Sequence, residues 1–408
     1  ILLILFSTII ISILYLSLIG IETSKFNNQI KKKITNFSKD IEVELKEVKL
    51  VLDPLNFQFN SKTLGPKIKF KNQIFELESI KTQVSLNSIF KDSFPLKNLD
   101  ISTKSLEVRK LISLIRTIKK DPKLFILENF IEKGYILADI KLEFDENGNV
   151  KNNYTINGFV KNGKIDFFKK YKLEKINFNF QVGKEISNFQ EINFLYNGLN
   201  LSFEKLTTKN IENEVYIDGK IINKNLIIKE NFLEEFFGDS EVKIQKIDLN
   251  SENIFSFKLD KKFKIQDFKL KSKIKFNEVK ILNNFDLENF FPQINKQINL
   301  TNHNIEIDYY KNELRCKGSG SILLQKNKDQ IEYIISKKDK KIYFNTSLVI
   351  NENEFLIDFL NYKKNDKTKL KIQLKGNKDQ NGSFKLNLLN LKNEEDEIEL
   401  KNALFDKN

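Results

Sequence analysis

The side chains best suited to catalysis or metal binding are rare in this chain of 408 residues. It contains one histidine, His303, and one cysteine, Cys316. His303 lies in the polar stretch Thr301–Asn304, with no second histidine or nearby cysteine at the spacing of a zinc site, so we expect a solvated loop residue. Arg315 could lower the pKa of the neighbouring Cys316 thiol, but thiolate catalysis also needs a base. We therefore expect Cys316 to be an unreactive buried thiol.

Two other motifs resemble known binding loops but lack residues that those loops require. Gly318 and Gly320 lack the third glycine and the following helix of a dinucleotide-binding loop, and the sequence has no P-loop. The stretch from Asp145 resembles the start of a calcium-binding loop, but Val150 and Ile156 occupy the positions of the required glycine and bidentate glutamate. We therefore expect a protein that is not an enzyme and that uses no cofactor and no metal.

The basic excess of the chain does not point to nucleic acid. The 68 lysines and arginines exceed the 55 acidic residues by 13, but the only arginines are Arg109, Arg116 and Arg315. Recognition of bases and phosphates favours the two-pronged guanidinium of arginine. The lysines alternate with acidic residues along the chain, as they do on a solvated face. We expect no nucleic-acid partner.

Residues 1–20 form an apolar segment without charge. A helix of this length spans about 30 Å, the thickness of a bilayer's hydrocarbon core. A cleaved signal peptide has a shorter apolar region and a cleavage site of small residues, and neither is present. We therefore predict a transmembrane anchor over residues 1–20, while Lys25 and Lys31–Lys33 leave its orientation open because long domains translocate despite such charge.

Three amphipathic helices are expected, of which the first would cap the strands that follow, and Leu226–Phe237 and Asp286–Phe291 are shorter helical candidates. The first has apolar positions at spacings of 4, 4 and 3, reaches to about Asp40, and carries the capping residues Phe26, Ile30, Ile34 and Phe37. The second covers Val108–Ile118. The third begins at Pro122, where a proline suits the first turn, and is expected to extend to Gly134.

Period-two alternation dominates the chain from residue 41 onward. Each alternating run has one apolar and one polar face, which is typical of antiparallel sheet with water on one side. The first run is expected to be one long strand with a bulge, ended by Asp53-Pro54. The candidates for the apolar face that would bind a ligand are Ile41, Val43, Leu45, Ile140, Leu142, Phe144, Ile176, Phe178, Phe180, Leu199, Leu201 and Phe203. The sequence thus predicts a mostly β fold with a few short helices.

Glycines preceded by Asn or Asp divide these runs in two ways. Asn147-Gly148, Asn162-Gly163 and Asn381-Gly382 are predicted hairpin turns, because Asn-Gly supplies the positive φ angles that a two-residue turn needs. Asn157-Gly158 and Asp218-Gly219 fall inside alternating runs, where glycine commonly marks a bulge or a bend.

A sheet of so many strands has a large apolar face and few helices to cover it. The face must close on itself or curl into a trough. A trough lined by Ile, Leu, Val and Phe would accept acyl chains, with about 0.8 kcal/mol for each methylene buried. A sandwich whose core is filled by the protein's own side chains remains the alternative.

Several short motifs resemble the AsmA-like superfamily, which includes the YhdP and TamB types. They are the segment Gly20–Asn27 directly after the apolar helix, the strands Val43–Leu50 and Ile80–Leu86, and the glycine-containing region Gly134–Gly163. The resemblance implies an elongated, curled antiparallel sheet that forms a taco-like groove in the periplasm of a Gram-negative bacterium. It further implies an inner-membrane anchor, transport of phospholipid toward the outer membrane, and no catalytic residues.

The expected organisation follows from the pattern and the resemblance together. Residues 1–20 would be the anchor, residues 21–133 an AsmA- or chorein-like β region with amphipathic helices, and residues 134–408 a repetitive β-groove. The expected partners are the inner-membrane bilayer, phospholipid acyl chains, and outer-membrane or periplasmic proteins. The competing interpretations are an assembly or translocation factor for outer-membrane or secreted β-proteins, and a membrane-tethered scaffold that transports nothing.

Overall fold

The computed structural model divides the chain into two compact units. The first unit comprises Ile1–Tyr196 and Thr207–Asn210, and the second comprises Asn197–Leu206 and Ile211–Asn408. The structure describes all residues except 1, 25–26, 36–40, 71–72, 87–97, 119–121, 146–150, 152, 168–170, 213, 231, 234–241, 263, 285, 359–360, 365–366, 381 and 406–408. The predicted turn at Asn147-Gly148 and the predicted capping residues Phe26 and Phe37 lie outside the described residues.

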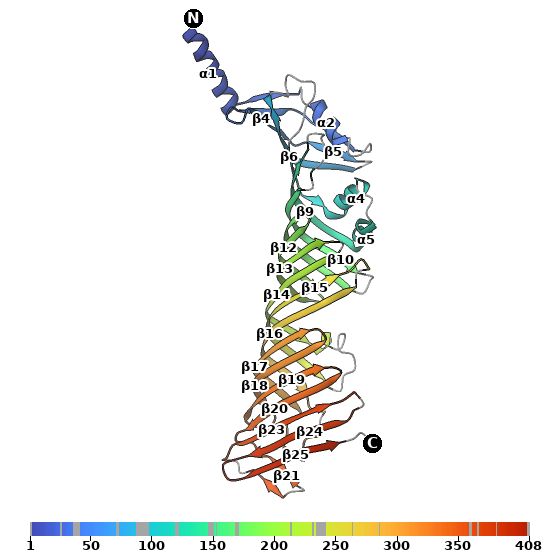
Figure 1. Cartoon of the computed structure of the whole chain (residues 1–408), viewed down its shortest axis with the longest axis vertical. Coiled ribbons are helices and arrows are strands. Elements are labelled where there is room, and N and C mark those ends of the chain that lie inside the picture. Colours follow the sequence, from blue (N-terminus) through green and yellow to red (C-terminus); the bar gives the residue numbers. More distant parts are fainter. Residues whose placement is uncertain are drawn as a thin grey trace. The chain divides into compact units, whose positions relative to one another are not determined.

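The first unit is built on an antiparallel sheet (Figure 1). Its strands pair in the order β1–β3–β4–β6–β7–β9–β10–β11–β12, while β5 joins β2 to β6, and β8 pairs with β9. The bounds are β1 Ile21–Thr23, β2 Ile41–Glu44, β3 Val48–Asp53, β4 Gln58–Leu64, β5 Lys67–Phe70, β6 Gln73–Ser85, β7 Asn98–Thr103, β8 Leu106–Glu107, β9 Ile131–Glu143, β10 Thr155–Phe167, β11 Tyr171–Gly183 and β12 Ile186–Tyr196.

The prediction of one long bulged strand from Ile41 was wrong. Residues 41–44 form β2, which pairs with β5, whereas residues 48–53 form β3, which pairs with β1 and β4. The one-residue slip in the alternation therefore marks the passage from one partner strand to another. Val43 from β2 and Val48 from β3 nevertheless reach the same buried cluster, because both strands keep their apolar face inward.

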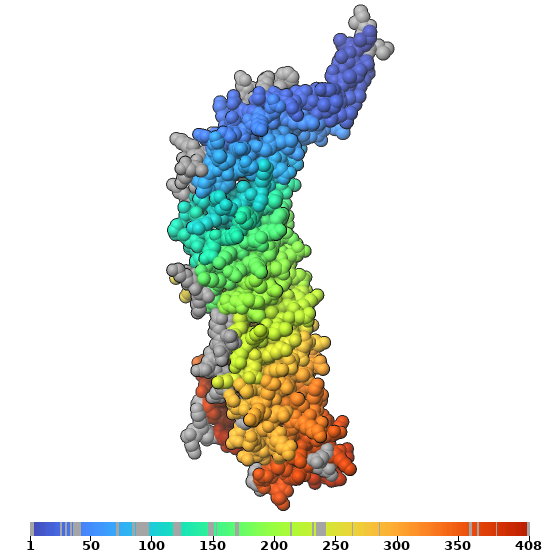
Figure 2. Space-filling model, turned by 180° about the vertical axis from the view of Figure 1, so that it is seen from behind, coloured from blue at the N-terminus to red at the C-terminus, as the bar shows by residue number. Residues whose placement is uncertain are grey.

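The apolar N-terminal segment forms helix α1, Leu2–Leu18. It stands out from the strands that follow it (Figure 2), and Ile4, Leu5 and Phe6 are more than 60% exposed. In the described part of the chain no helix has both the length and the apolar character needed to cross a membrane, so the transmembrane segment expected over residues 1–20 is not supported.

The described part of the first unit contains three further helices. Helix α2, Asn27–Thr35, contains Ile30 and Ile34, and the predicted end near Asp40 lies outside the described residues. Helix α4, Val108–Ile118, has the predicted bounds. Helix α5, Pro122–Phe130, begins at the predicted proline but ends four residues before Gly134, because residues 131–143 enter the sheet as β9.

The second unit is also antiparallel. From β14 each strand pairs with the next, except that β20 pairs with β23 and that β21 and β22 form a separate hairpin. The bounds are β13 Leu199–Ile211, β14 Glu214–Lys229, β15 Ile244–Leu259, β16 Ile265–Leu282, β17 Gln297–Tyr310, β18 Glu313–Leu323, β19 Lys328–Lys338, β20 Lys341–Ile350, β21 Leu356–Ile357, β22 Tyr362–Lys363, β23 Leu370–Lys378, β24 Phe384–Lys392 and β25 Glu397–Phe405. The mostly β, antiparallel class with short helices is confirmed.

Bulges in successive strands of the first unit keep the apolar side chains on one face. Asn162, Lys175 and Glu191 have φ angles of 52°, 51° and 52° and lie at register shifts in β10, β11 and β12. Asn177 accepts a hydrogen bond from the Asn162 backbone N–H at 3.0 Å and donates one to the Lys175 carbonyl at 2.7 Å. Asn193 donates to the Glu191 carbonyl at 2.9 Å. Such bulges bend and twist strands, and asparagine side chains satisfy the backbone groups that the bulges leave unpaired.

The glycine predictions had mixed outcomes. Asn162-Gly163 is not a hairpin turn, since the strand continues through the bulge to Phe167. Gly382 does lie in a hairpin, but the loop between β23 and β24 covers residues 379–383 instead of two residues. Gly158 and Gly219 lie inside strands as expected, yet neither is at a register shift.

Each of these strand glycines lies opposite an aromatic ring. Gly158 is paired with Phe180 and Gly219 with Phe255. A Cβ atom at Gly158 would approach Phe180 Cζ to 2.8 Å, and one at Gly219 would approach Phe255 Cε1 to 2.5 Å. The same cross-strand pairing joins Gly318 to Tyr333 and Gly376 to Phe344. The absent side chain thus leaves space in which the ring folds over the neighbouring strand.

Candidate functional site

An apolar cavity of about 840 Å³ lies in the first unit. This volume falls within the range that small-molecule sites occupy. Apart from Thr103, Lys133 and Gly163, every lining side chain is apolar. The lining residues are Ile68, Phe75, Leu77, Leu99, Ile101, Thr103, Leu106, Val108, Leu111, Ile112, Leu114, Ile115, Leu124, Leu127, Ile131, Lys133, Ile136, Ala138, Ile140, Leu142, Ile156, Val160, Gly163, Ile165, Ile176, Phe178, Phe180, Val182 and Phe189.

Strand alternation produces the sheet wall of this cavity. In β11, Ile176, Phe178 and Phe180 line the cavity, whereas the intervening Asn179 is exposed. In β10, the bulge at Asn162 leaves two residues, instead of one, between the lining position Val160 and the next lining position, Gly163. The extra residue restores the phase of the alternation, so that the apolar side chains remain on the cavity side of both halves of the strand.

Three aromatic rings from β11 and β12 form part of this wall. The ring centre of Phe178 lies 6.1 Å from that of Phe180 and 5.9 Å from that of Phe189, with the second pair edge to face. These separations are typical of favourable aromatic pairs. All three rings are half-buried, so they support one another without closing the space in front of them.

Helices α4 and α5 form the opposite wall. They lie beside β9 and β10 (Figure 1), and they contribute Leu111, Ile112 and Leu124, among others, to the lining. Arg116 of α4 joins the helices by an ion pair with Glu128 of α5 at 3.0 Å. Its guanidinium also lies 5.2 Å from the ring centre of Phe125. These two contacts of Arg116 link α4 to α5 over the apolar face.

The charged groups of β9–β11 lie mainly outside the cavity. Lys164 of β10 pairs with Glu132 of β9 at 3.2 Å and with Glu174 of β11 at 3.3 Å, and these two partners raise the pKa of Lys164. Such exposed cross-strand pairs add solubility and little stability. The cavity therefore presents no set of polar groups that would fix a polar ligand in one orientation.

The structure divides the predicted lining residues among three places. Ile140, Leu142, Ile176, Phe178 and Phe180 line the cavity, while Val43, Leu45 and Phe144 belong to or pack against a filled core beside it. Leu199, Leu201 and Phe203 are half-buried on β13 of the second unit and do not belong to the cavity. Ile41 pairs with Phe70, but its side chain lies outside the described set, as do those of Ile30 and Ile34 in α2.

Sequence reasoning missed the lining residues that helices contribute. Helix α4 was expected as an amphipathic helix, but nothing in the alternation indicated that its apolar side would stand off from the strands and leave a cavity. The signal that could have found α5 is its lack of a polar face, because Leu124, Phe125, Ile126 and Leu127 are consecutive. A helix that is apolar on all sides is stable only when protein side chains or lipid surround it.

His303 is not the solvated loop residue that was predicted. It lies in β17 and is 1% exposed, because Gly320 leaves room for its ring beside β18. His303 Nε2 lies 3.1 Å from Tyr333 Oη, and the rings are stacked at 5.6 Å. Burial lowers the pKa of His303 and raises the pKa of Tyr333 to about 12. The pair is thus neutral at ordinary pH.

The described residues hold no other constellation that indicates catalysis. Burial raises the pKa of the half-buried Cys316 thiol, which disfavours a reactive thiolate. Within the described ranges no group of three or more His, Cys, Asp or Glu side chains could hold a metal ion.

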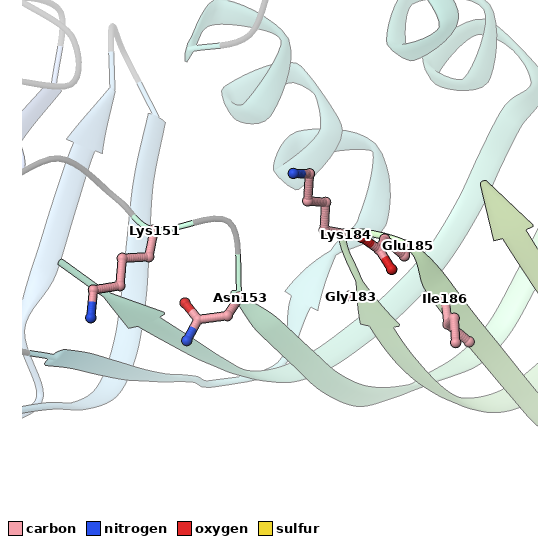
Figure 3. Close-up of a pocket in the computed structure, with 6 residues that line it drawn as sticks. All are labelled: Lys151, Asn153, Gly183, Lys184, Glu185 and Ile186. Carbon is pink, nitrogen blue, oxygen red and sulfur yellow. The ribbon is translucent and has the colours of Figure 1, made fainter. Parts of the chain in front are cut away.

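A depression of about 610 Å³ lies where β11 meets β12 (Figure 3). Its six lining residues are Lys151, Asn153, Gly183, Lys184, Glu185 and Ile186. The side chains of Lys184 and Ile186 point in opposite directions, and the Glu185 carboxylate lies near Lys184 but away from Lys151. These groups do not converge on one ligand atom.

The second unit has a core of its own, called the filled core below. This filled core comprises Phe291, Ile298, Leu324, Ile350, Phe355, Ile357, Leu370 and Leu391, each at most 7% exposed. The rings of Phe291 and Phe355 meet edge to face at 5.3 Å. Segments outside the main strands thus supply the side chains that close this core.

A buried polar group lies beside the filled core. Asp329 is fully buried and accepts hydrogen bonds from the Asn351 backbone N–H at 2.9 Å and from Asn353 Nδ2 at 2.7 Å. Burial raises the pKa of Asp329, while these bonds and the charge of the buried Lys364 oppose that rise. The network ties β19 to the segment that precedes β21.

Comparison with known proteins adds no family. No family model, no curated protein and no solved structure matches the chain. The AsmA-like resemblance therefore remains an expectation drawn from the sequence, and the function is argued below from the cavity.

Proposed function

We propose that this protein binds the acyl chains of membrane lipids in the apolar cavity of its first unit and is not an enzyme. The observation that carries the proposal is the cavity itself, a space of about 840 Å³ with walls of aliphatic and aromatic side chains. An apolar space of this size is costly unless an apolar ligand fills it. About ten buried methylenes would contribute about 8 kcal/mol, before the costs of ordering the ligand.

The absence of converging polar groups in the lining suits this ligand class. Lys133 is the only charged side chain among the lining residues. A ligand held by apolar contact alone is bound without a fixed orientation, so chains of different lengths fit and can slide. The headgroup of a lipid stays outside the cavity in this proposal.

Helix α1 supports an assignment to a membrane surface. It carries no charged side chain, most of its exposed side chains are apolar, and Leu18 is 80% exposed. Such a helix is stabilised when lipid surrounds it. We propose that α1 holds the chain at a bilayer from which the cavity takes its lipid.

The wider role rests on the AsmA-like resemblance. On that basis the chain is an inner-membrane protein with its bulk in the periplasm, and it helps to move phospholipid between the inner and outer membranes. An assembly factor that pairs with client β-strands and a scaffold that transports nothing are the alternatives. They differ from the proposal in what should occupy the cavity.

Mass spectrometry of material that co-purifies with the full chain tests the proposal. Abundant phospholipid or fatty acid is expected, and it should be lost from the variant Phe178→Asp, because a carboxylate in an apolar site is strongly disfavoured. Gln181→Asp is the matched control, since Gln181 is exposed on the same strand and is not among the lining residues. Client β-strand peptides in place of lipid, or wild-type lipid levels in Phe178→Asp, would contradict the proposal.

A further inference from the structure

The outer surface of the α4–α5 helix pair is apolar. Phe125, Ile126 and Leu127 of α5 are 55%, 49% and 43% exposed, and Ile115 of α4 is 37% exposed. We call these four residues the portal surface. Soluble proteins seldom expose several large apolar side chains side by side unless the patch contacts a partner.

The portal surface is continuous with the cavity. Ile115 and Leu127 belong to both, since each lines the cavity and is also exposed to solvent. Ile112 and Leu114, by contrast, are at most 8% exposed and seal the inner side of α4. An acyl chain could therefore pass from the portal surface to the cavity lining without crossing a polar side chain.

The charge of the two helices identifies the partner. Helix α4 carries Arg109, Lys110 and Arg116 and no acidic residue, and α5 carries Lys123 and Glu128. The two helices thus carry four cations and one carboxylate, and Glu107, directly before α4, pairs with Lys110 at 2.7 Å, so a basic excess remains around the patch. Basic side chains beside an apolar patch are the combination by which surface helices bind anionic bilayers. Two of the three arginines of the whole chain lie on this one helix.

We propose that the portal surface docks on an anionic lipid bilayer and that acyl chains enter the cavity between α4 and α5. The inference rests on the proposed function and adds the place at which the lipid enters. Helix α1 holds the chain near a bilayer, whereas the portal surface contacts the lipids that are withdrawn.

The test compares extraction from vesicles with binding in solution, using the full chain. A fluorescent fatty acid is supplied either free in buffer or within vesicles, made of phosphatidylcholine alone or of phosphatidylcholine mixed with phosphatidylglycerol. The variants are Phe125→Glu and Ile126→Glu, and both positions are exposed, so the fold should tolerate them. The matched control is Phe159→Glu, because Phe159 is 42% exposed on β10 but is not among the cavity-lining residues.

The expected result is a loss in extraction alone. Both variants should bind the free fatty acid as the wild type does, but extract it from the anionic vesicles about fivefold more slowly, since each adverse charge at the bilayer surface is worth about 1 kcal/mol. Phe159→Glu should match the wild type, and the wild type should extract more slowly from neutral vesicles. Wild-type extraction rates in both variants, or equal wild-type rates from the two vesicle types, would overturn the inference. Failure of the wild type to bind the free fatty acid would instead refute the proposed function.

Discussion

The cavity of the first unit and the filled core of the second show two ways to cover the same kind of sheet face. Both are lined by alternating apolar residues of antiparallel strands. In the first unit, α4 and α5 cover the face and leave about 840 Å³ unfilled. In the second, Phe291 and Phe355 come from segments between strands, Ile357 comes from the short strand β21, and all three are at most 7% exposed. The covering segment, and not the strand pattern, decides whether a binding space remains.

The largest contrast should appear in aromatic-to-alanine substitutions. Phe355→Ala in the filled core should lower the free energy of unfolding by about 3–5 kcal/mol, because it opens a new cavity in a closed core. Phe178→Ala in delipidated protein should cost only about 1–1.5 kcal/mol, because the half-buried ring already borders an open space.

Urea unfolding, monitored by hydrogen exchange in peptides from each unit, measures the loss of unfolding free energy in the two units separately. Equal losses at the two positions would show that the cavity is closed in solution, and the contrast between the two regions would then be wrong.

The bulges that shape the cavity wall can be weakened without touching the lining. Asn177→Ala removes two hydrogen bonds, one to each of the bulges at Asn162 and Lys175, and should cost about 1–2 kcal/mol. It should also weaken acyl-chain binding, because the bulges set which side chains face the cavity.

Gln181→Ala is the control for Asn177→Ala, since both side chains lie away from the lining and Gln181 supports no bulge. Fluorescent fatty-acid titration together with thermal unfolding gives both quantities. A stability loss without any change in affinity would separate the bulges from the geometry of the cavity.

The sequence predicted the strands far better than the space between them. Alternation around Phe178 and the proline at the start of α5 indicated real elements, although β11 is longer than the alternating run 176–182 and α5 ends four residues before Gly134. Hairpin reasoning failed at Asn162-Gly163, because an Asn-Gly pair suits a left-handed bulge as well as a turn. Asparagine side chains form hydrogen bonds to the backbone groups that these bulges leave unpaired. The sequence did not reveal this role, because it does not show which strands lie side by side.

The cavity and the buried histidine could not be predicted for a related reason. Whether α4 rests on the strands or stands off from them depends on side-chain volumes across several elements, which periodicity does not encode. His303 looked solvated because its sequence neighbours are polar, but those neighbours face outward from a strand whose inner face holds the ring. The space that accepts the ring is supplied by Gly320, on another strand.

The smallest expected effect is a pH dependence confined to the second unit. Burial lowers the pKa of His303 in the folded protein, so the unfolded chain binds its proton more readily. The stabilising contribution is therefore complete above the unfolded pKa of about 6.5 and is lost as the pH falls below it.

Thermal unfolding of the wild type and of His303→Gln across this pH range tests whether stability falls with pH as predicted. The wild type should lose stability more steeply than the variant below pH of about 6.5. Parallel curves would mean that His303 is accessible to protons in the folded protein, which contradicts its burial.

Photo-crosslinking with a diazirine-labelled fatty acid tests the central claim most directly, because it reports where in the chain the ligand lies. After digestion of the labelled full chain, peptides of α4, α5 and β9–β12 should carry the label, and excess unlabelled fatty acid should remove it. Peptides that contain Phe291 and Phe355 should stay unlabelled, because the filled core has no room for a ligand. Label confined to α1, or spread equally over both units, would contradict the claim that the cavity of the first unit is the acyl-chain site.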